Sequence, residues 1–136
     1  MISQGFTLST DLFETQTLSK QFINERCCGE DFANWLHSAL TTRGYRISTP
    51  IQEDFGWVLL LTRDPHVFTL SIGIMDEAIG MVQAEWRIDI SFEKPLNGFH
   101  AWFRRPPRME LEHLASAIEQ CLRTEVRFRN VTAVTP

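Results

Sequence analysis

Two adjacent carboxylates, Glu53 and Asp54, stand directly before the most apolar run of the chain. A carboxylate pair can act as general acid and base when its surroundings drive the two pKa values apart, and it can also ligate a metal. Neighbours along an extended segment point to opposite sides, however, so these two share a site only if a turn reorients them. The simpler interpretation is structural: a polar turn after Pro50 ends at Asp54, Gly56 permits close backbone approach, and Trp57 anchors the next strand in the core.

A catalytic alternative needs a histidine beside these carboxylates. The candidates are His66, in a predicted hairpin turn, and His100, in a loop. Glu110 and His113 have the spacing of helical carboxylate metal sites, but no second motif of this kind accompanies them, so we expect a solvated helix face and no metal. Phosphate-binding glycine loops, nucleophile elbows and zinc motifs are absent from the sequence, which favours a protein without catalysis or cofactor.

Three cysteines are present, an odd count. Cys27 and Cys28 are neighbours that bridge each other only with strain, so all three are expected to be free thiols in a reducing compartment. A helix that starts just after Cys28 would favour a reactive thiolate, but a nucleophile also needs a base, which the sequence does not identify. Cys121 falls on an apolar helix stripe and is expected to be inert core.

The loop from Lys94 to Arg108, KPLNGFHAWFRRPPR, combines aromatic and cationic side chains. This composition is typical of protein-interface hot spots and of platforms for single-stranded nucleic acid. The residues concerned are Phe99, Trp102, Phe103, Arg104 and Arg105. In the alternative interpretation the aromatic rings fold back over the edge of the core and the arginines are solvated or paired with nearby glutamates.

Composition favours a soluble globular protein. The 136 residues have a typical single-domain length and are expected to form one domain over residues 1–136. The formal charge of −4 gives no electrostatic footprint for nucleic acid. The N-terminus lacks the basic and apolar regions of a secretory signal, and the longest apolar run, Trp57 to Leu61, is far below the roughly 20 residues that span a bilayer. We therefore expect a cytoplasmic protein that binds neither nucleic acid nor membrane.

Hydrophobic periodicity predicts two helices. The first begins near Glu30 and stops at Gly44, and its apolar positions are Phe32, Trp35, Leu36, Ala39 and Leu40. The second follows Pro107, and its apolar stripe contains Leu111, Leu114, Ala115, Ile118, Cys121 and Leu122.

Alternating patterns predict strands at 45–48, 56–63, 67–74 and 84–93, a weak edge strand within 5–13, and a last strand at 125–131. If Asp64 and Pro65 close a hairpin, the apolar pairs Leu61–Phe68, Leu59–Leu70 and Trp57–Ile72 share one sheet face. That face must be covered, and the two helices are the available cover. The predicted fold is an α+β two-layer sandwich, an antiparallel β-meander with two helices on one face, in the order β-α-β-β-β-β-α-β.

The opposite sheet face is predicted to be polar except for a strip formed by Val58 and Leu60. Its other members are Arg46, Ser48, Thr62, Thr69, Ser71, Arg87, Asp89 and Ser91. An apolar strip on an otherwise polar, solvent-exposed face is a candidate contact surface.

The stretches ERCCGEDFANWLHSALTTRGY and TPIQEDFGW resemble the signature of an uncharacterised family of small bacterial proteins. In that family an Arg-Cys-x-Gly-x-Asp-Phe stretch opens a Trp-Leu helix, and a Glu-Asp-Trp-Gly-Trp stretch follows. The resemblance covers about residues 25 to 62, and Phe55 stands where the family has tryptophan. It implies no activity, cofactor or catalytic residue, but it suggests that one set of residues acts together, with Arg26 pairing a carboxylate of the turn: Arg26, Cys27, Asp31, Glu53, Asp54 and Trp57.

The function expected from these observations is a non-catalytic binding module. It would contact a protein partner or a second copy of itself through the polar sheet face or through the loop from Phe99 to Arg108. Small acidic α+β proteins of this kind also resemble, by class, immunity proteins that neutralise toxins. The alternative is a small-ligand-binding protein or an enzyme in which Glu53, Asp54 and a histidine converge.

Overall fold

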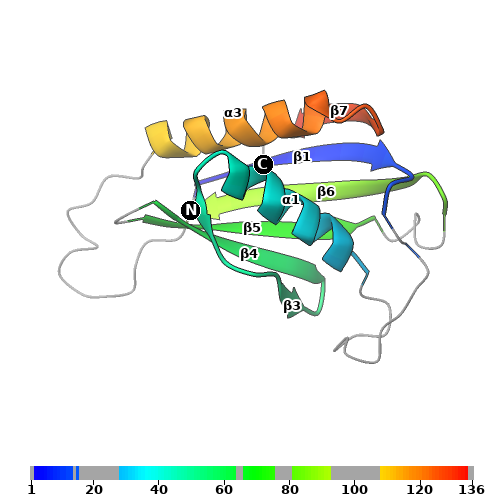
Figure 1. Cartoon of the computed structure of the whole chain (residues 1–136), viewed down its shortest axis with the longest axis horizontal. Coiled ribbons are helices and arrows are strands. Elements are labelled where there is room, and N and C mark those ends of the chain that lie inside the picture. Colours follow the sequence, from blue (N-terminus) through cyan, green and yellow to red (C-terminus); the bar gives the residue numbers. More distant parts are fainter. Residues whose placement is uncertain are drawn as a thin grey trace.

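The computed structural model of the chain describes residues 2–13, 15, 28–63, 66–75, 81–92 and 108–134. Within these ranges, two helices lie on one side of a seven-stranded antiparallel sheet (Figure 1), which confirms the predicted α+β fold. The elements in chain order are β1 (Ile2–Thr10), α1 (Glu30–Thr42), β2 (Arg46–Ile47), β3 (Ile51–Glu53), β4 (Gly56–Arg63), β5 (His66–Ile74), β6 (Ala84–Phe92), α3 (Arg108–Thr124) and β7 (Phe128–Val134).

The strands β4, β5 and β6 form the predicted meander. The sheet order is β2-β4-β5-β6-β1-β7, and β3 pairs with β4 beside β2. Arg63 lies opposite His66, so the hairpin has the predicted register, and the three apolar pairs occur as predicted: Trp57–Ile72, Leu59–Leu70 and Leu61–Phe68. Because side chains alternate along a strand, this register turns all three pairs to the same side of the sheet.

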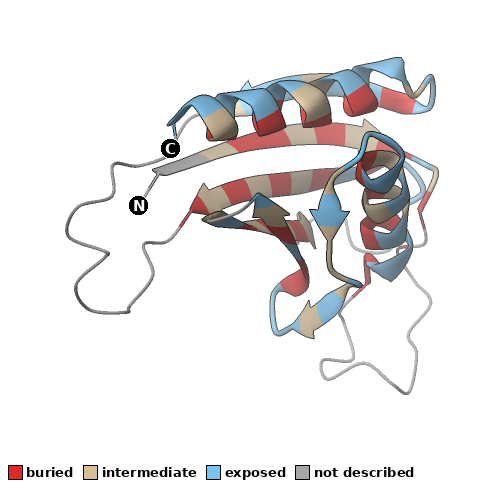
Figure 2. Cartoon of the chain, turned by 60° about the vertical axis from the view of Figure 1, so that its left-hand side comes forward, coloured by how far each residue is buried: buried red, intermediate tan, exposed pale blue. Residues whose placement is uncertain are grey.

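Both helices pack on that apolar side and form one core with it (Figure 2). Trp57 is 5% exposed and Ile88 is fully buried, as predicted. The apolar stripe of α3 is buried at every predicted position: Leu111, Leu114, Ala115, Ile118, Cys121 and Leu122. In α1 the buried stripe is rotated relative to the prediction, since Ala33 is buried while Trp35 and Ala39 are half-buried.

The predictions for the two terminal strands are wrong in part. β1 is not an edge strand, because β6 pairs with it on one side and β7 on the other. β7 is the edge strand, and it begins at Phe128 rather than at Glu125. Residues 125–127 form a turn instead, in which the Phe128 amide donates to the Glu125 carbonyl at 3.0 Å and the Arg127 amide donates to Glu125 Oε1 at 3.3 Å.

A strand that the sequence analysis missed, β3, replaces most of the predicted polar turn. Ile51 lies opposite Val58, and Glu53 lies opposite Gly56. The turn between β3 and β4 therefore consists of Asp54 and Phe55 alone.

Candidate functional site

One face of the sheet, called the outer face below, is not covered by any element in the described ranges. Its side chains alternate with the buried ones, and the strand registers place them together. Most are short and polar. The outer face comprises Gly5, Thr7 and Ser9 of β1, Ile51 of β3, Val58, Leu60 and Thr62 of β4, Val67, Thr69, Ser71 and Gly73 of β5, and Glu85, Arg87, Asp89 and Ser91 of β6.

Three exposed apolar side chains interrupt the outer face on neighbouring strands. Ile51 of β3 is 40% exposed, Leu60 of β4 is 38% exposed and Val67 of β5 is 45% exposed. Ile51 lies opposite Val58, and Val67 lies opposite Thr62, so the three occupy successive outer-face rows along β4. We call Ile51, Leu60 and Val67 the apolar patch.

The predicted strip of Val58 and Leu60 is correct for Leu60 only. Val58 lies on the outer face but is 8% exposed, so it supports the patch from below and offers little contact area itself. Alternation along a strand shows which face a side chain occupies, but it does not show whether neighbouring side chains cover it. The sequence analysis placed neither Ile51 nor Val67 on this face. The alternation along β5 was a usable signal for Val67, whereas β3 is too short to provide one for Ile51.

A hollow of about 550 Å³ adjoins the apolar patch at the β2 edge. Two hydrogen bonds fix its floor: the Ser48 amide donates to the Leu60 carbonyl at 2.8 Å, and the Leu60 amide donates to Ser48 Oγ at 2.9 Å. These bonds hold the backbone of Leu60, the residue that belongs both to the patch and to the lining of the hollow. The lining residues are His37, Thr41, Tyr45, Arg46, Ile47, Ser48, Leu60 and Thr62.

The centre of the outer face carries an ion pair between Arg87 and Asp89. Arg87 Nε donates to Asp89 Oδ2 at 2.9 Å and to Oδ1 at 3.1 Å. This hydrogen bond, and then the Coulombic attraction, raises the pKa of Arg87. The two side chains are 39% and 41% exposed, so the pair faces solvent.

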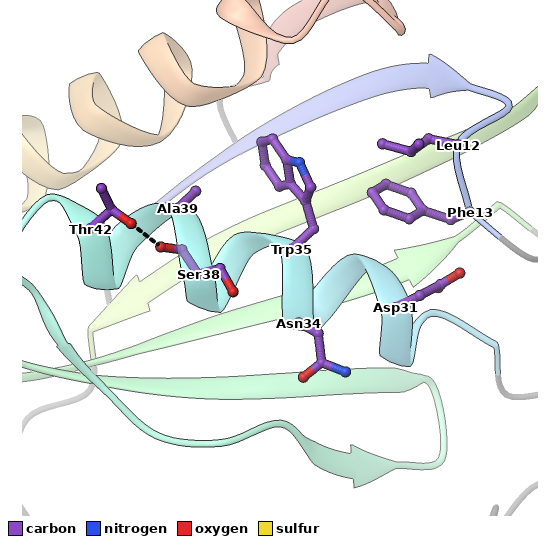
Figure 3. A pocket seen from close by; sticks show the side chains of 8 residues that line it. All are labelled: Leu12, Phe13, Asp31, Asn34, Trp35, Ser38, Ala39 and Thr42. Carbon is purple, nitrogen blue, oxygen red and sulfur yellow. Dashed lines mark hydrogen bonds between the residues drawn. The ribbon is translucent and has the colours of Figure 1, made fainter.

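A second concave region lies on the helix side, between α1 and the end of β1. This open groove has a volume of about 630 Å³. In Figure 3, Leu12 and Phe13 point toward the half-buried Trp35 of α1, while Asn34 points away from it. Polar and apolar side chains thus line different parts of the groove, and the polar ones do not converge on one point.

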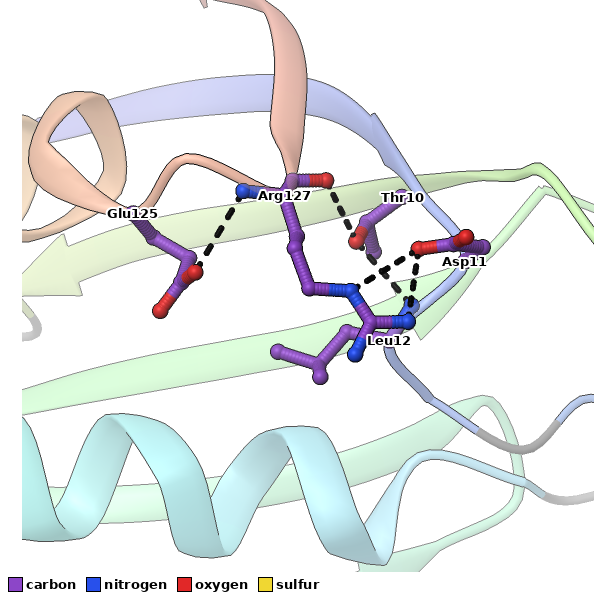
Figure 4. Close-up of polar contacts among 5 residues, drawn as sticks. All are labelled: Thr10, Asp11, Leu12, Glu125 and Arg127. Carbon is purple, nitrogen blue, oxygen red and sulfur yellow. Dashed lines mark hydrogen bonds and ion pairs between the residues drawn. The ribbon is translucent and has the colours of Figure 1, made fainter.

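A buried threonine secures the rim of this groove (Figure 4). Thr10 is fully buried, and its Oγ1 donates to the Arg127 carbonyl at 2.8 Å and accepts from the Leu12 amide at 3.1 Å. The Arg127 guanidinium also donates to Asp11 Oδ1, at 3.0 and 3.2 Å, but this pair is solvent-exposed and contributes little stability.

Replacement of Thr10 by valine is expected to lower the free energy of unfolding by about 1–3 kcal/mol, because it leaves a carbonyl and an amide without their buried partner. Urea denaturation measures the change. Thr132→Val is the matched control: Thr132 is exposed and its hydroxyl bonds only the nearby Asn130 carbonyl, so a change within about 0.5 kcal/mol is expected. Equal losses for the two variants would contradict the role given to Thr10.

The structure separates the residues of the catalytic alternative. Glu53 and Asp54 are both exposed at the turn before β4, whereas His66 lies beyond its other end, opposite Arg63. The eight-residue strand β4 puts roughly 23 Å between these ends. His100, the other candidate histidine, lies outside the described residues, as do Arg26, Cys27, Phe99, Trp102, Phe103, Arg104 and Arg105.

The two stretches that carry the family resemblance meet in the core. A Cβ added at Gly29 would lie 3.4 Å from Trp57 and 3.0 Å from Trp86, so Gly29 packs against both rings. Cys28 beside it is 4% exposed. The helix start and Trp57 therefore pack against each other at Gly29.

Glu110 and His113 line a small cavity of about 20 Å³ together with Tyr45 and Arg63. The Arg63 guanidinium carbon lies 5.5 Å from the centre of the Tyr45 ring, a cation–π contact. The cavity has room for about one water molecule. No group of three or more metal-ligating side chains occurs among the residues that the structure describes.

Comparisons with protein-family models, with curated proteins and with solved structures find no match to this chain. The family resemblance of residues 25 to 62 therefore stays a prediction. Neither helix of the described part is long and apolar enough to cross a membrane.

Proposed function

We propose that this chain is a non-catalytic binding module whose outer face holds a protein partner. The observation that supports this most directly is the apolar patch. Its three exposed aliphatic side chains lie on successive rows of a face whose other side chains are mostly short and polar. Scattered exposed apolar residues are ordinary on protein surfaces, but a contiguous group with a polar rim is typical of an interaction site.

The setting of the patch also suits a contact surface. The backbone of Leu60 is fixed by the two hydrogen bonds to Ser48, so little backbone freedom is lost there when a partner binds. The adjoining hollow would accept a protruding side chain of the partner. A cytoplasmic location is part of this proposal, because Cys28 and Cys121 are free thiols buried in the core.

An enzymatic or ligand-binding role for Glu53 and Asp54 has less support. Both are exposed, the cavities described above are lined by other residues, and His66 lies at the far end of β4. An immunity-like role is compatible with the proposal, since it too consists of holding a protein partner.

Photo-crosslinking in cells that naturally express the chain tests the proposal. A benzoylphenylalanine at position 69, opposite Leu60 on the outer face, is expected to give a light-dependent protein adduct that a Leu60→Asp change reduces several-fold. The same probe at Val126 serves as the control, because Val126 is 90% exposed in the turn between α3 and β7. Equal labelling from both positions, or no adduct from position 69, would overturn the proposal.

A further inference from the structure

We propose that the partner of the outer face is a second copy of this chain, so that two sheets pack face to face across a two-fold axis. This inference rests on the proposed function, namely that the outer face is the binding surface. Three features of that face argue for self-association: its balance of charge, its flat centre and its area.

The charges of the outer face and of the three strands beside it, β2, β3 and β7, are balanced, whereas those of the chain are not. Within the described ranges, this surface carries as many arginines as carboxylates: Arg46, Arg87 and Arg129 against Glu53, Glu85 and Asp89. The whole chain has a net charge of −4, so two copies repel each other at most orientations. Positive and negative charges are interspersed on this surface and sum to zero, so two copies can meet there without the repulsion between their net charges.

Neutral mixed charge also fits the symmetry of a dimer. In a two-fold contact the same surface is used twice, so a positive group on one copy must meet a negative group on the other. Arg87 and Asp89 are two residues apart on one strand. An antiparallel second copy would bring Arg87 of each copy near Asp89 of the other. A partner of strongly basic or acidic chemistry would gain no such complementarity here.

The centre of the outer face is flat enough for another sheet. The ion pair lies over Gly5, where an added Cβ would come within 2.7 Å of Asp89 Oδ1. Gly5 therefore lets the carboxylate lie against the sheet. The strand neighbours of the pair are short as well: Thr7 and Gly73 lie opposite Arg87, and Ser71 lies opposite Asp89. Packed sheets need a separation of about 10 Å, which short side chains permit.

The area is at the lower end of what a stable dimer needs. The five long strands β4, β5, β6, β1 and β7 occupy a width of roughly 24 Å at the usual strand spacing, and their seven to nine residues run roughly 23–30 Å. The resulting footprint of roughly 550–700 Å² is somewhat below the roughly 800 Å² per partner of a standard interface. The apolar patch supplies the hydrophobic part, and the polar centre limits the expected affinity to the micromolar range.

Sedimentation equilibrium of the full chain between about 1 µM and 1 mM tests the inference. We expect a reversible change from 15.7 kDa to twice that mass. Leu60→Asp and, separately, Val67→Asp should each raise the dissociation constant at least about tenfold, as loss of an interface anchor does. Val126→Asp introduces the same charge at an exposed apolar residue outside the outer face and should leave the constant unchanged. Circular dichroism shows which variants are folded, and only these are compared. If Leu60→Asp does not fold, the dissociation constant of Val67→Asp decides the test.

The outcomes separate this inference from the proposed function. A monomer up to about 1 mM, or a dimer that survives both outer-face substitutions, overturns self-association. If the photo-adduct at position 69 then contains a different protein, the binding role of the outer face stands and only the identity of the partner is wrong. A monomer with no adduct at position 69 overturns both.

Discussion

The Trp86→Ala variant is expected to lose about 3–5 kcal/mol of unfolding free energy, a large part of what holds a domain of this size together. Trp86 is fully buried at the centre of the core. Its ring meets Phe32 edge-on at a centroid distance of 5.4 Å and Phe13 at 6.0 Å, and Gly29 packs against it from the helix start. Truncation therefore leaves a cavity shared by β6, α1 and the end of β1, which the rigid sheet cannot close.

Two matched variants make this expectation specific, with urea denaturation as the measurement. Trp35→Ala removes the same atoms from a half-buried position, so roughly half the loss is expected. Trp86→Phe keeps an aromatic ring and removes an indole N–H that has no hydrogen-bond acceptor among the described residues. Because an unsatisfied buried donor is itself costly, this variant should lose far less than Trp86→Ala. Equal losses for Trp35→Ala and Trp86→Ala would contradict the central position of Trp86.

The parts of the fold that are local in sequence could be predicted. The strands from Gly56 to Phe92 alternate strongly in sequence, and the Asp64-Pro65 pair predicted the hairpin whose register β4 and β5 adopt. The helix stripes follow from a 3.6-residue period, which shows clearly over 13 and 17 residues. A three-residue strand such as β3 is too short to show any period, so it was not found.

Contacts between the chain ends could not be predicted. β1 and β7 pair although more than 100 residues separate them, with Thr10 opposite Phe128. No local pattern specifies which strand fills the place beside β6. The position of β1 inside the sheet therefore depends on tertiary packing. The weak alternation of its sequence predicted an edge strand instead.

The candidate site was predictable only to the level of the sheet face. Alternation placed Leu60 on the outer face correctly, and the same alternation placed Val58 there without showing that it is covered. The carboxylates Glu53 and Asp54 stood out by residue type, but strand register separates them from His66. Spatial convergence is a property of the folded chain, and residue types alone do not supply it.

Replacement of Gly56 by alanine is expected to cost about 2–5 kcal/mol, through a steric clash and through backbone strain together. An added Cβ at this position would overlap the Ile72 carbonyl oxygen of the neighbouring strand, and it would lie 3.2 Å from the Ile72 carbonyl carbon. Both are backbone atoms of the sheet, which cannot move aside as a flexible side chain can. The φ angle of +154° is also one that residues with a Cβ rarely adopt.

Gly44→Ala isolates the second of these effects, because Gly44 has a φ of +92° but no atom within 4 Å of an added Cβ. A loss of about 1–2 kcal/mol is expected there, from backbone strain alone. The difference between the two variants in urea denaturation measures the clash with Ile72. Since Gly56 also begins the strand that carries Leu60, the clash should loosen β3 and β4 and speed amide exchange at Leu60. A Gly56→Ala protein as stable as Gly44→Ala would show that β4 and β5 separate easily at this end, which contradicts the rigid support proposed for the apolar patch.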